Sequence, residues 1–238
     1  MPKKQKAVLP AVMTGLAFLA FLTVYWLLTV RSVAPRWGVG LLFLFPAAVL
    51  GALTVLTRRG KLSAMAGNVF AVLLTGFFLL TSFVLLVVLS FRGATHPVTD
   101  PALYERVLQL TAREHRGLLE AFPPDIPPEA ADVTFYYAPQ LLQGAGEWEL
   151  SYAASEAEMT DRAAEWRASA RCTAPAEHWP ADALLPEGLL PECVRREAGY
   201  TVCLLEAEPY QPDSWNHGRL RLAAYREDGR LIWYSSIW

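Results

Sequence analysis

The sequence predicts a three-helix transmembrane anchor followed by a soluble α+β domain with a mainly antiparallel sheet. The first observation behind this prediction is a segregation of charge. All 23 acidic residues lie at or after Asp100, so residues 1–99 carry a net charge of +9 and residues 100–238 a net charge of -11. The second observation is that long apolar runs fill the basic part, whereas the acidic part shows the short periodic patterns of a globular domain.

Three runs without any charged residue, 7–30, 37–57 and 62–91, make up most of the basic part. About 20 apolar residues are needed for a helix to cross the hydrocarbon core of a bilayer. Every backbone N–H and C=O must be paired inside the segment in lipid, so these runs are expected to be helices. We predict a transmembrane domain over residues 1–92, with spans at about 8–30, 37–57 and 67–91.

The first run could instead be a signal peptide, because lysines precede it. Its apolar stretch is longer than the roughly 7–15 residues of such a segment. The small residues at 32–34 that could form a cleavage site are followed by Pro35, a poor position for cleavage. The sequence therefore favours a retained anchor.

Basic residues near the span ends predict the orientation, because Lys and Arg are retained on the cytoplasmic side. Residues 31, 36 and 92 are the arginines that fall on the opposite side from the N-terminus. The side of the N-terminus carries six basic residues: Lys3, Lys4, Lys6, Arg58, Arg59 and Lys61. We expect a multi-pass protein of the cell membrane with a cytoplasmic N-terminus and an extracytoplasmic C-terminal domain.

The spans themselves carry no ionisable residue, which disfavours a transporter, because such groups are costly in lipid and are retained for function. Small residues such as Ala47 and Gly51 allow helices to approach closely, and Pro46 predicts a kink in the second span. Thr54 and similar side chains suit hydrogen bonds between helices. The bilayer is the expected partner, and self-association or a protein partner bound through the helices stays open, as does a pore formed on oligomerisation.

The first half of the soluble domain, predicted over residues 100–238, begins with a helix. Asp100 can cap it, and Pro101 occupies the first helical position. Alternating residues then predict two antiparallel strands near 133–137 and 148–152. Ser155 begins a capping box, and a second helix with an apolar stripe follows it.

The second half of the domain begins with an irregular connection over residues 172–191, which are rich in Pro and Ala. A strand is predicted at 200–207. Residues 220–224 and 231–233, separated by Asp228 and Gly229, form a closing hairpin. The order of helix, two strands, helix and three strands is typical of an α+β domain, with the helices expected on one face of the sheet.

Signatures of catalysis or cofactor binding are missing from the sequence. The histidines at 96, 115, 178 and 217 lack the spacing of a metal site, and Glu114–His115 is interpreted as a solvated face of the first helix. No Gly-rich phosphate loop or nucleophile elbow occurs. We therefore predict no catalytic, metal or cofactor-binding residue and no cofactor. The acidic domain has no lysine, which argues against nucleic acid as a partner.

Two features remain as candidate sites. Cys172 and Cys193 flank the Pro-rich connection, and we hypothesise that they form a disulfide in an oxidising compartment, leaving Cys203 buried in its strand. The densest group of recognising side chains is a predicted loop, in which an aromatic ring beside amide and imidazole donors suits a polar ligand. The simpler interpretation is a turn that satisfies its own backbone and core. Its candidate ligand-binding residues are Asp213, Trp215, Asn216 and His217.

Several short segments, at 122–127, 135–137, 142–144 and 215–218, resemble those of uncharacterised membrane-anchored proteins of clostridia-like Gram-positive bacteria. The resemblance covers about 100 residues and implies an anchored or exported protein without a known activity. The sequence thus predicts a membrane-anchored extracytoplasmic binding or interaction module of unknown ligand. A membrane-bound enzyme acting on envelope material, or a structural subunit of a membrane complex, are the alternatives.

Overall fold

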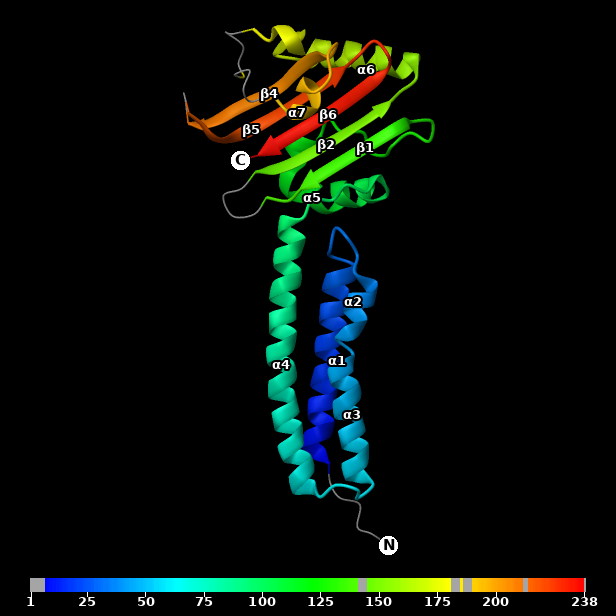
Figure 1. Cartoon of the computed structure of the whole chain (residues 1–238), viewed down its shortest axis with the longest axis vertical. Coiled ribbons are helices and arrows are strands. Elements are labelled where there is room, and N and C mark those ends of the chain that lie inside the picture. Colours follow the sequence, from blue (N-terminus) through cyan, green and yellow to red (C-terminus); the bar gives the residue numbers. More distant parts are fainter. Residues whose placement is uncertain (1–6, 141–144, 181–184, 186–189, 212–213, 238) are drawn as a thin grey trace. The chain divides into compact units, whose positions relative to one another are not determined.

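The fold is that of a computed structural model, which describes the chain except for residues 1–6, 141–144, 181–184, 186–189, 212–213 and 238. Side chains at 113–114 and 210–217 are likewise outside the description. The chain divides into two compact units, Met1–Gly93 and Ala94–Trp238, and each is described by itself (Figure 1).

The first unit contains three apolar segments that are long enough to cross a membrane, as predicted. They are α1 (Val8–Thr29), the pair α2 (Trp37–Leu42) and α3 (Phe45–Arg58), and α4 (Ala64–Thr95). The second segment is broken between α2 and α3, with Pro46 in the first turn of α3. Proline lacks the N–H that would continue the helix, so the predicted kink is confirmed. The last helix begins before and ends after the predicted span.

Small residues and threonines hold the helices of this unit together. The hydroxyls of Thr14 on α1 and Thr54 on α3 lie 3.1 Å apart, so the predicted hydrogen bond between helices is confirmed. A Cβ added at Gly51 would lie 3.6 Å from the side chain of Thr14. Gly67 of α4 lies against Thr57, where a Cβ would overlap the side chain. The close approach at Gly67 therefore depends on the absence of a side chain, whereas a methyl group at Gly51 would make an ordinary van der Waals contact.

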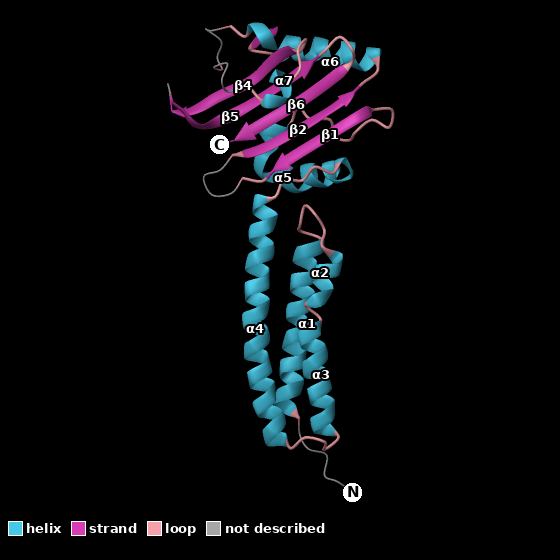
Figure 2. Cartoon of the chain, in the orientation of Figure 1, coloured by secondary structure: helices cyan, strands magenta, loops and turns pink. Residues whose placement is uncertain are grey.

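The second unit contains a six-stranded sheet with strand order β1-β2-β6-β5-β4-β3, and every neighbouring pair is antiparallel (Figure 2). The predicted α+β class with an antiparallel sheet is thus confirmed. The strands are β1 (Ala131–Ala138), β2 (Gly146–Ala153), β3 (Cys172–Pro175), β4 (Thr201–Gln211), β5 (Ser214–Tyr225) and β6 (Arg230–Ile237). Strand β3 was wrongly predicted as irregular, because four residues with a terminal proline make an edge strand without a clear alternating pattern.

Two helices cover one face of this sheet. Helix α5 (Tyr104–Leu119) follows the 3₁₀ turn η1 (Pro101–Leu103), and Asp100 Oδ1 accepts a hydrogen bond from the backbone N–H of Ala102 at 3.0 Å. Helix α6 (Glu156–Ser169) is capped by Ser155, whose Oγ accepts from the N–H of Glu158 at 3.2 Å. The predicted cap at Ser155 is confirmed, whereas Asp100 caps the 3₁₀ turn that leads into α5, and α5 itself has no side-chain cap. The start of each helix is fixed locally, before any tertiary contact forms.

An aromatic cluster joins α6 to the sheet. The ring of Trp233 on β6 stacks on Tyr152 of β2 at 5.0 Å and meets Trp166 of α6 edge-on at 5.1 Å. All three side chains are buried. Aromatic pairs of this kind add to the free energy of burial, so this cluster is the centre of the helix-covered face.

Helix α5 is interrupted at His115, whose backbone is non-helical with φ -126° and ψ 32°. Its imidazole packs on the ring of Trp148 at 5.0 Å, so the prediction of a solvated side chain was wrong for this residue. Two carbonyls after the interruption are bound by the sheet: Gly117 O accepts from Arg221 at 2.9 Å, and Leu118 O accepts from Ser235 Oγ at 2.7 Å. The interrupted helix is thereby fastened to β5 and β6.

The opposite face of the sheet is covered over part of its width. The short helix α7 (Glu192–Arg195) and the chain before it lay an apolar cluster on β4, β5 and β6. Leu185, Leu190 and Val194 of this segment are buried on Leu204 and Leu222 of the sheet. No described residue of β1 or β2 belongs to that cluster. The expectation that helices lie on one face was therefore incomplete, and the β1–β2 part of the second face stays open beside α7.

Candidate functional site

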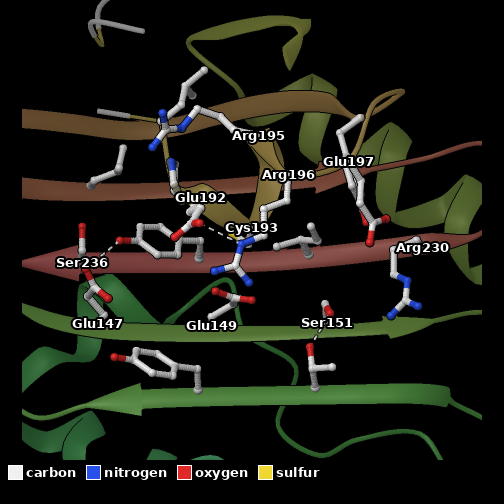
Figure 3. A pocket seen from close by; sticks show the side chains of 18 of the residues that line it. Glu147, Glu149, Ser151, Glu192, Cys193, Arg195, Arg196, Glu197, Arg230 and Ser236 are labelled. Atoms are coloured by element: carbon white, nitrogen blue, oxygen red, sulfur yellow. Dashed lines mark hydrogen bonds and ion pairs between the residues drawn. The ribbon is translucent and has the colours of Figure 1, made fainter. Parts of the chain in front are cut away.

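A cavity of about 850 Å³ lies where the open part of the sheet meets α7 (Figure 3). We call it the α7 hollow. Its size falls in the range of about 300–1,000 Å³ found for small-molecule sites. The floor is formed by side chains of β1, β2 and β6, and one wall is formed by α7 and the turn after it. The polar and aromatic floor residues are Thr134, Tyr136, Glu147, Glu149, Ser151, Tyr234 and Ser236, and the charged wall residues are Glu192, Arg195, Arg196 and Glu197.

The floor is polar because β2 alternates. Trp148 and Leu150 point to the helix-covered face and are buried there. Successive side chains of a strand point to opposite faces, so Glu147, Glu149 and Ser151 share the face of the hollow. The sequence had shown this alternation. It did not show that a wall stands beside the polar side.

Pairing of the strands brings tyrosines beside the carboxylates. Glu149 is the direct cross-strand partner of Tyr136 on β1 and of Tyr234 on β6. Directly opposite residues have Cβ atoms about 4.5–5.5 Å apart. The hydroxyl of Tyr234 also donates a hydrogen bond to Glu147 Oε1 at 3.4 Å. Two carboxylates and two phenol rings therefore form a continuous patch on the floor.

The wall of the hollow supplies a thiol and a guanidinium to the same patch. The thiol of Cys193 makes a hydrogen bond with the carboxylate of Glu149. Arg196 extends from the turn after α7 over Glu149 (Figure 3), but its ion pair is with Glu192, Nε to Oε1 at 3.0 Å. That pair is exposed on both sides, so it contributes little to stability.

Two other charged groups that line the hollow are paired with residues outside it. Glu197 binds Arg226 at 2.5 Å, and Arg230 lies 3.8 Å from Asp132. Within the described part of the chain, neither Glu147 nor Glu149 has an ion-pair partner. The floor thus carries an excess of negative charge in a partly enclosed space, which the nearby guanidinium of Arg196 offsets only in part.

Burial shifts the pKa of two groups that line the hollow, Glu149 and Cys193. Loss of solvent raises the pKa of Glu149, and the neighbouring Glu147 adds to this effect, while the hydrogen bond from Cys193 and the charge of Arg196 act against it. Burial and the carboxylate of Glu149 also raise the pKa of the Cys193 thiol. This thiol therefore stays protonated at neutral pH. Cysteine nucleophiles need the opposite shift.

We predict that Glu149→Gln stabilises the domain at neutral pH. The folded-state pKa of Glu149 lies above its unfolded value. The contribution of this residue to folding stability is therefore fully present below the unfolded pKa and is lost as pH rises through the folded pKa. The amide cannot ionise and escapes that loss. Thermal unfolding of the full chain at pH 4 to 8 measures this, with the exposed Glu120→Gln as control. Equal pH profiles for the wild type and Glu149→Gln would contradict the assignment.

The structure describes the sequence-predicted recognition loop only in part. Asp213 lies outside the described residues. Trp215, Asn216 and His217 belong to β5 and not to a loop, because β4 and β5 stay paired up to Gln211 and Ser214. Their side chains are among those not described. No described residue of this segment is among those lining the hollow.

The cysteines were predicted to include one disulfide. In the structure Cys172, Cys193 and Cys203 are all free thiols, so the bond between Cys172 and Cys193 is not formed. Cys172 lies at the start of β3, whereas Cys193 lies in α7 and lines the hollow. Cys203 is fully buried in β4, as predicted.

Sequence reasoning missed the wall of the hollow. Helix α7 has four residues, which is too short for a periodic pattern. Pro191 at its N-cap position followed by Glu192 was the available signal, since prolines and acidic residues favour helix starts. That signal marks a helix start, but it does not place the helix against β2.

The described residues contain no group of three or more His, Cys, Asp or Glu side chains that could hold a metal ion. The hollow presents carboxylates, phenols and hydroxyls on its floor and guanidinium groups on its wall. Such a lining can bind a polar or charged ligand through hydrogen bonds and ion pairs. Comparison with known protein families, curated proteins and solved structures finds no match to this chain.

Proposed function

We propose that this protein is a membrane-anchored extracytoplasmic binding module that takes its ligand into the α7 hollow. The observation that carries the proposal is the contrast on one face of the sheet. Most of that face is packed by apolar side chains under the α7 segment, whereas the β1–β2 part is concave and lined by convergent polar groups. A concave surface with a few placed polar groups is the usual form of a ligand site.

The anchor part of the proposal draws on the three apolar segments of the first unit. The extracytoplasmic location rests on the excess of Lys and Arg on the side of the N-terminus. The resemblance to membrane-anchored proteins of Gram-positive bacteria agrees with this location. A thiolate nucleophile in the hollow is disfavoured, because burial raises the pKa of Cys193, the thiol among the described lining residues.

A screen of polar small molecules against the full chain in lipid nanodiscs tests the binding function. We expect some compounds to raise the melting temperature of the wild type. They are expected to have no effect on Thr134→Trp, because Thr134 is an exposed floor residue whose enlargement fills the hollow and which lies in a strand that tolerates tryptophan. Compounds that stabilise both proteins equally, or none at all, would refute a site in the hollow.

Cysteine labelling in intact cells tests the orientation. Glu227→Cys, in a chain whose native cysteines are replaced, puts a thiol on an exposed turn of the second unit. A membrane-impermeant maleimide is expected to label it without permeabilisation. Ser236 would be a poor label site, since it is only 3% exposed. Labelling that requires a broken membrane would place the domain in the cytoplasm.

A further inference from the structure

We propose that the α7 hollow recognises a protonated amine, which binds to Glu149 and Glu147 with the rings of Tyr136 and Tyr234 beside it. This inference rests on the proposed function and adds the chemical class of the ligand. It is carried by the distribution of charge in the hollow, by the position of the aromatic rings, and by the arginines of the wall.

Charge is the first step. The hollow is lined by four carboxylates. The two carboxylates on the wall side already form ion pairs, Glu192 with Arg196 and Glu197 with Arg226. The two on the floor, Glu147 and Glu149, make no ion pair within the described ranges. A carboxylate that is partly removed from water and lacks a counter-ion is costly, so a cationic ligand gains most at the floor.

Aromatic geometry is the second step. Tyr136 and Tyr234 flank Glu149 on the neighbouring strands, so a cation bound to this carboxylate also meets phenol rings. Cations are attracted to the faces of such rings within about 6 Å of their centres. The same arrangement already occurs nearby, because the guanidinium of Arg226 lies 5.0 Å from the ring centre of Tyr200. At Tyr200 the chain supplies its own cation, whereas at Tyr136 and Tyr234 no cation contact is found among the described residues.

The wall determines what else the ligand carries. Arg195 is exposed, lines the hollow and has no ion pair in the described part of the chain. Together with Arg196 it disfavours a ligand that is only cationic and favours one with an acidic or strongly polar group away from the amine. The hollow thus fits a molecule with an amine at one end and a carboxylate or amide oxygens at the other. Both a free amino acid and a lysine-containing peptide have this chemistry.

Titration calorimetry of the full chain in nanodiscs tests the inference with matched probes. The probes are 6-aminohexanoate, hexanoate and acetyl-Gly-Lys-Gly-amide, each at up to about 10 mM, since millimolar affinities are common for small polar ligands. We expect 6-aminohexanoate or the peptide to bind and hexanoate not to bind. Binding of 6-aminohexanoate identifies a free small molecule as the source of the amine, whereas binding of the peptide alone identifies a polypeptide.

Two matched variants test whether the amine binds at Glu149. Glu149→Gln is expected to weaken binding by at least about tenfold, because a charge-assisted hydrogen bond is lost. Glu120→Gln, the same change at an exposed residue after α5, is expected to leave the affinity within about twofold. Absence of binding by both amine probes, or equal affinity in Glu149→Gln, overturns the inference. The binding function would survive that result if the screen still yields ligands that Thr134→Trp excludes.

Discussion

Replacing Trp233 by alanine is expected to lower the free energy of unfolding of the second unit by about 3–5 kcal/mol, the usual cost of removing a buried aromatic side chain. Trp233 is 1% exposed and contacts both Tyr152 and Trp166. A domain of ordinary stability has about 5–15 kcal/mol in total. The substitution should therefore remove a large share of the domain's stability.

Burial of the Trp233 indole also costs folding free energy, because its Nε1–H has no hydrogen-bond partner in the described structure. Trp233→Phe removes that buried donor and keeps an aromatic ring, so a smaller loss of about 1–2 kcal/mol is expected. Pulse proteolysis of the full chain across a urea series measures both variants. If Trp233→Ala and Trp233→Phe lose the same amount, the aromatic contacts of β6 are not what holds α6 to the sheet.

A valine in place of Gly229 is expected to destabilise the same unit by about 2–4 kcal/mol, since two separate penalties act at this position. Gly229 connects β5 to β6 with φ +89°, a conformation that residues with a side chain rarely adopt. A Cβ would also lie 2.9 Å from the carbonyl oxygen of Ala154. This oxygen belongs to a backbone segment that is itself fixed by the hydrogen bond from Ala154 N to Gly229 O at 2.9 Å.

The matched control for Gly229→Val is Gly117→Ala. Gly117 lies in the last turn of α5, and a Cβ there meets nothing within 4 Å. Alanine at an unobstructed helical site is expected to be neutral or to stabilise by up to about 1 kcal/mol. Urea midpoints measured by the same proteolysis assay compare the two. A Gly229→Val variant as stable as Gly117→Ala would show that the turn relaxes freely.

The membrane spans and the two capped helices were predictable because their signals are local. Uncharged runs of sufficient length allow one structure in lipid, and this is where α1, α3 and α4 are found. Asp100 caps the 3₁₀ turn that leads into α5, and Ser155 caps α6, each with its own side chain. In each case the residues that determine the element lie within it or directly before it.

The hollow was not predictable, because it depends on contacts between distant parts of the sequence. Glu147 and Glu149 alternate with buried residues, which by itself indicates a solvated sheet face. They line a hollow only because Cys193 and Arg196 lie on the same face of the sheet. These two residues come more than 40 positions later in the chain. Apolar packing of Leu190 and Val194 on β4 to β6 sets that position. No local pattern in the sequence reports such a placement.

The recognition loop shows the converse error. Asp213 to Gly218 contains turn-forming residues, and local composition therefore favoured a loop. Pairing with the preceding strand prevails instead, since β4 and β5 form a hairpin that extends from Thr201 paired with Tyr225 to Gln211 paired with Ser214. Strand propensity depends on the neighbours available for pairing. These neighbours are not visible in the segment itself.

Hydrogen exchange tests most directly whether the α7 hollow is the ligand site. At about ten times the dissociation constant of 6-aminohexanoate, or of the screen's best ligand, amides of residues 192–196 are expected to exchange about tenfold more slowly, because opening of α7 must release the ligand. The 3₁₀ turn Pro101–Leu103, which does not line the hollow, should be unchanged. Binding that leaves residues 192–196 as fast as before would contradict the account.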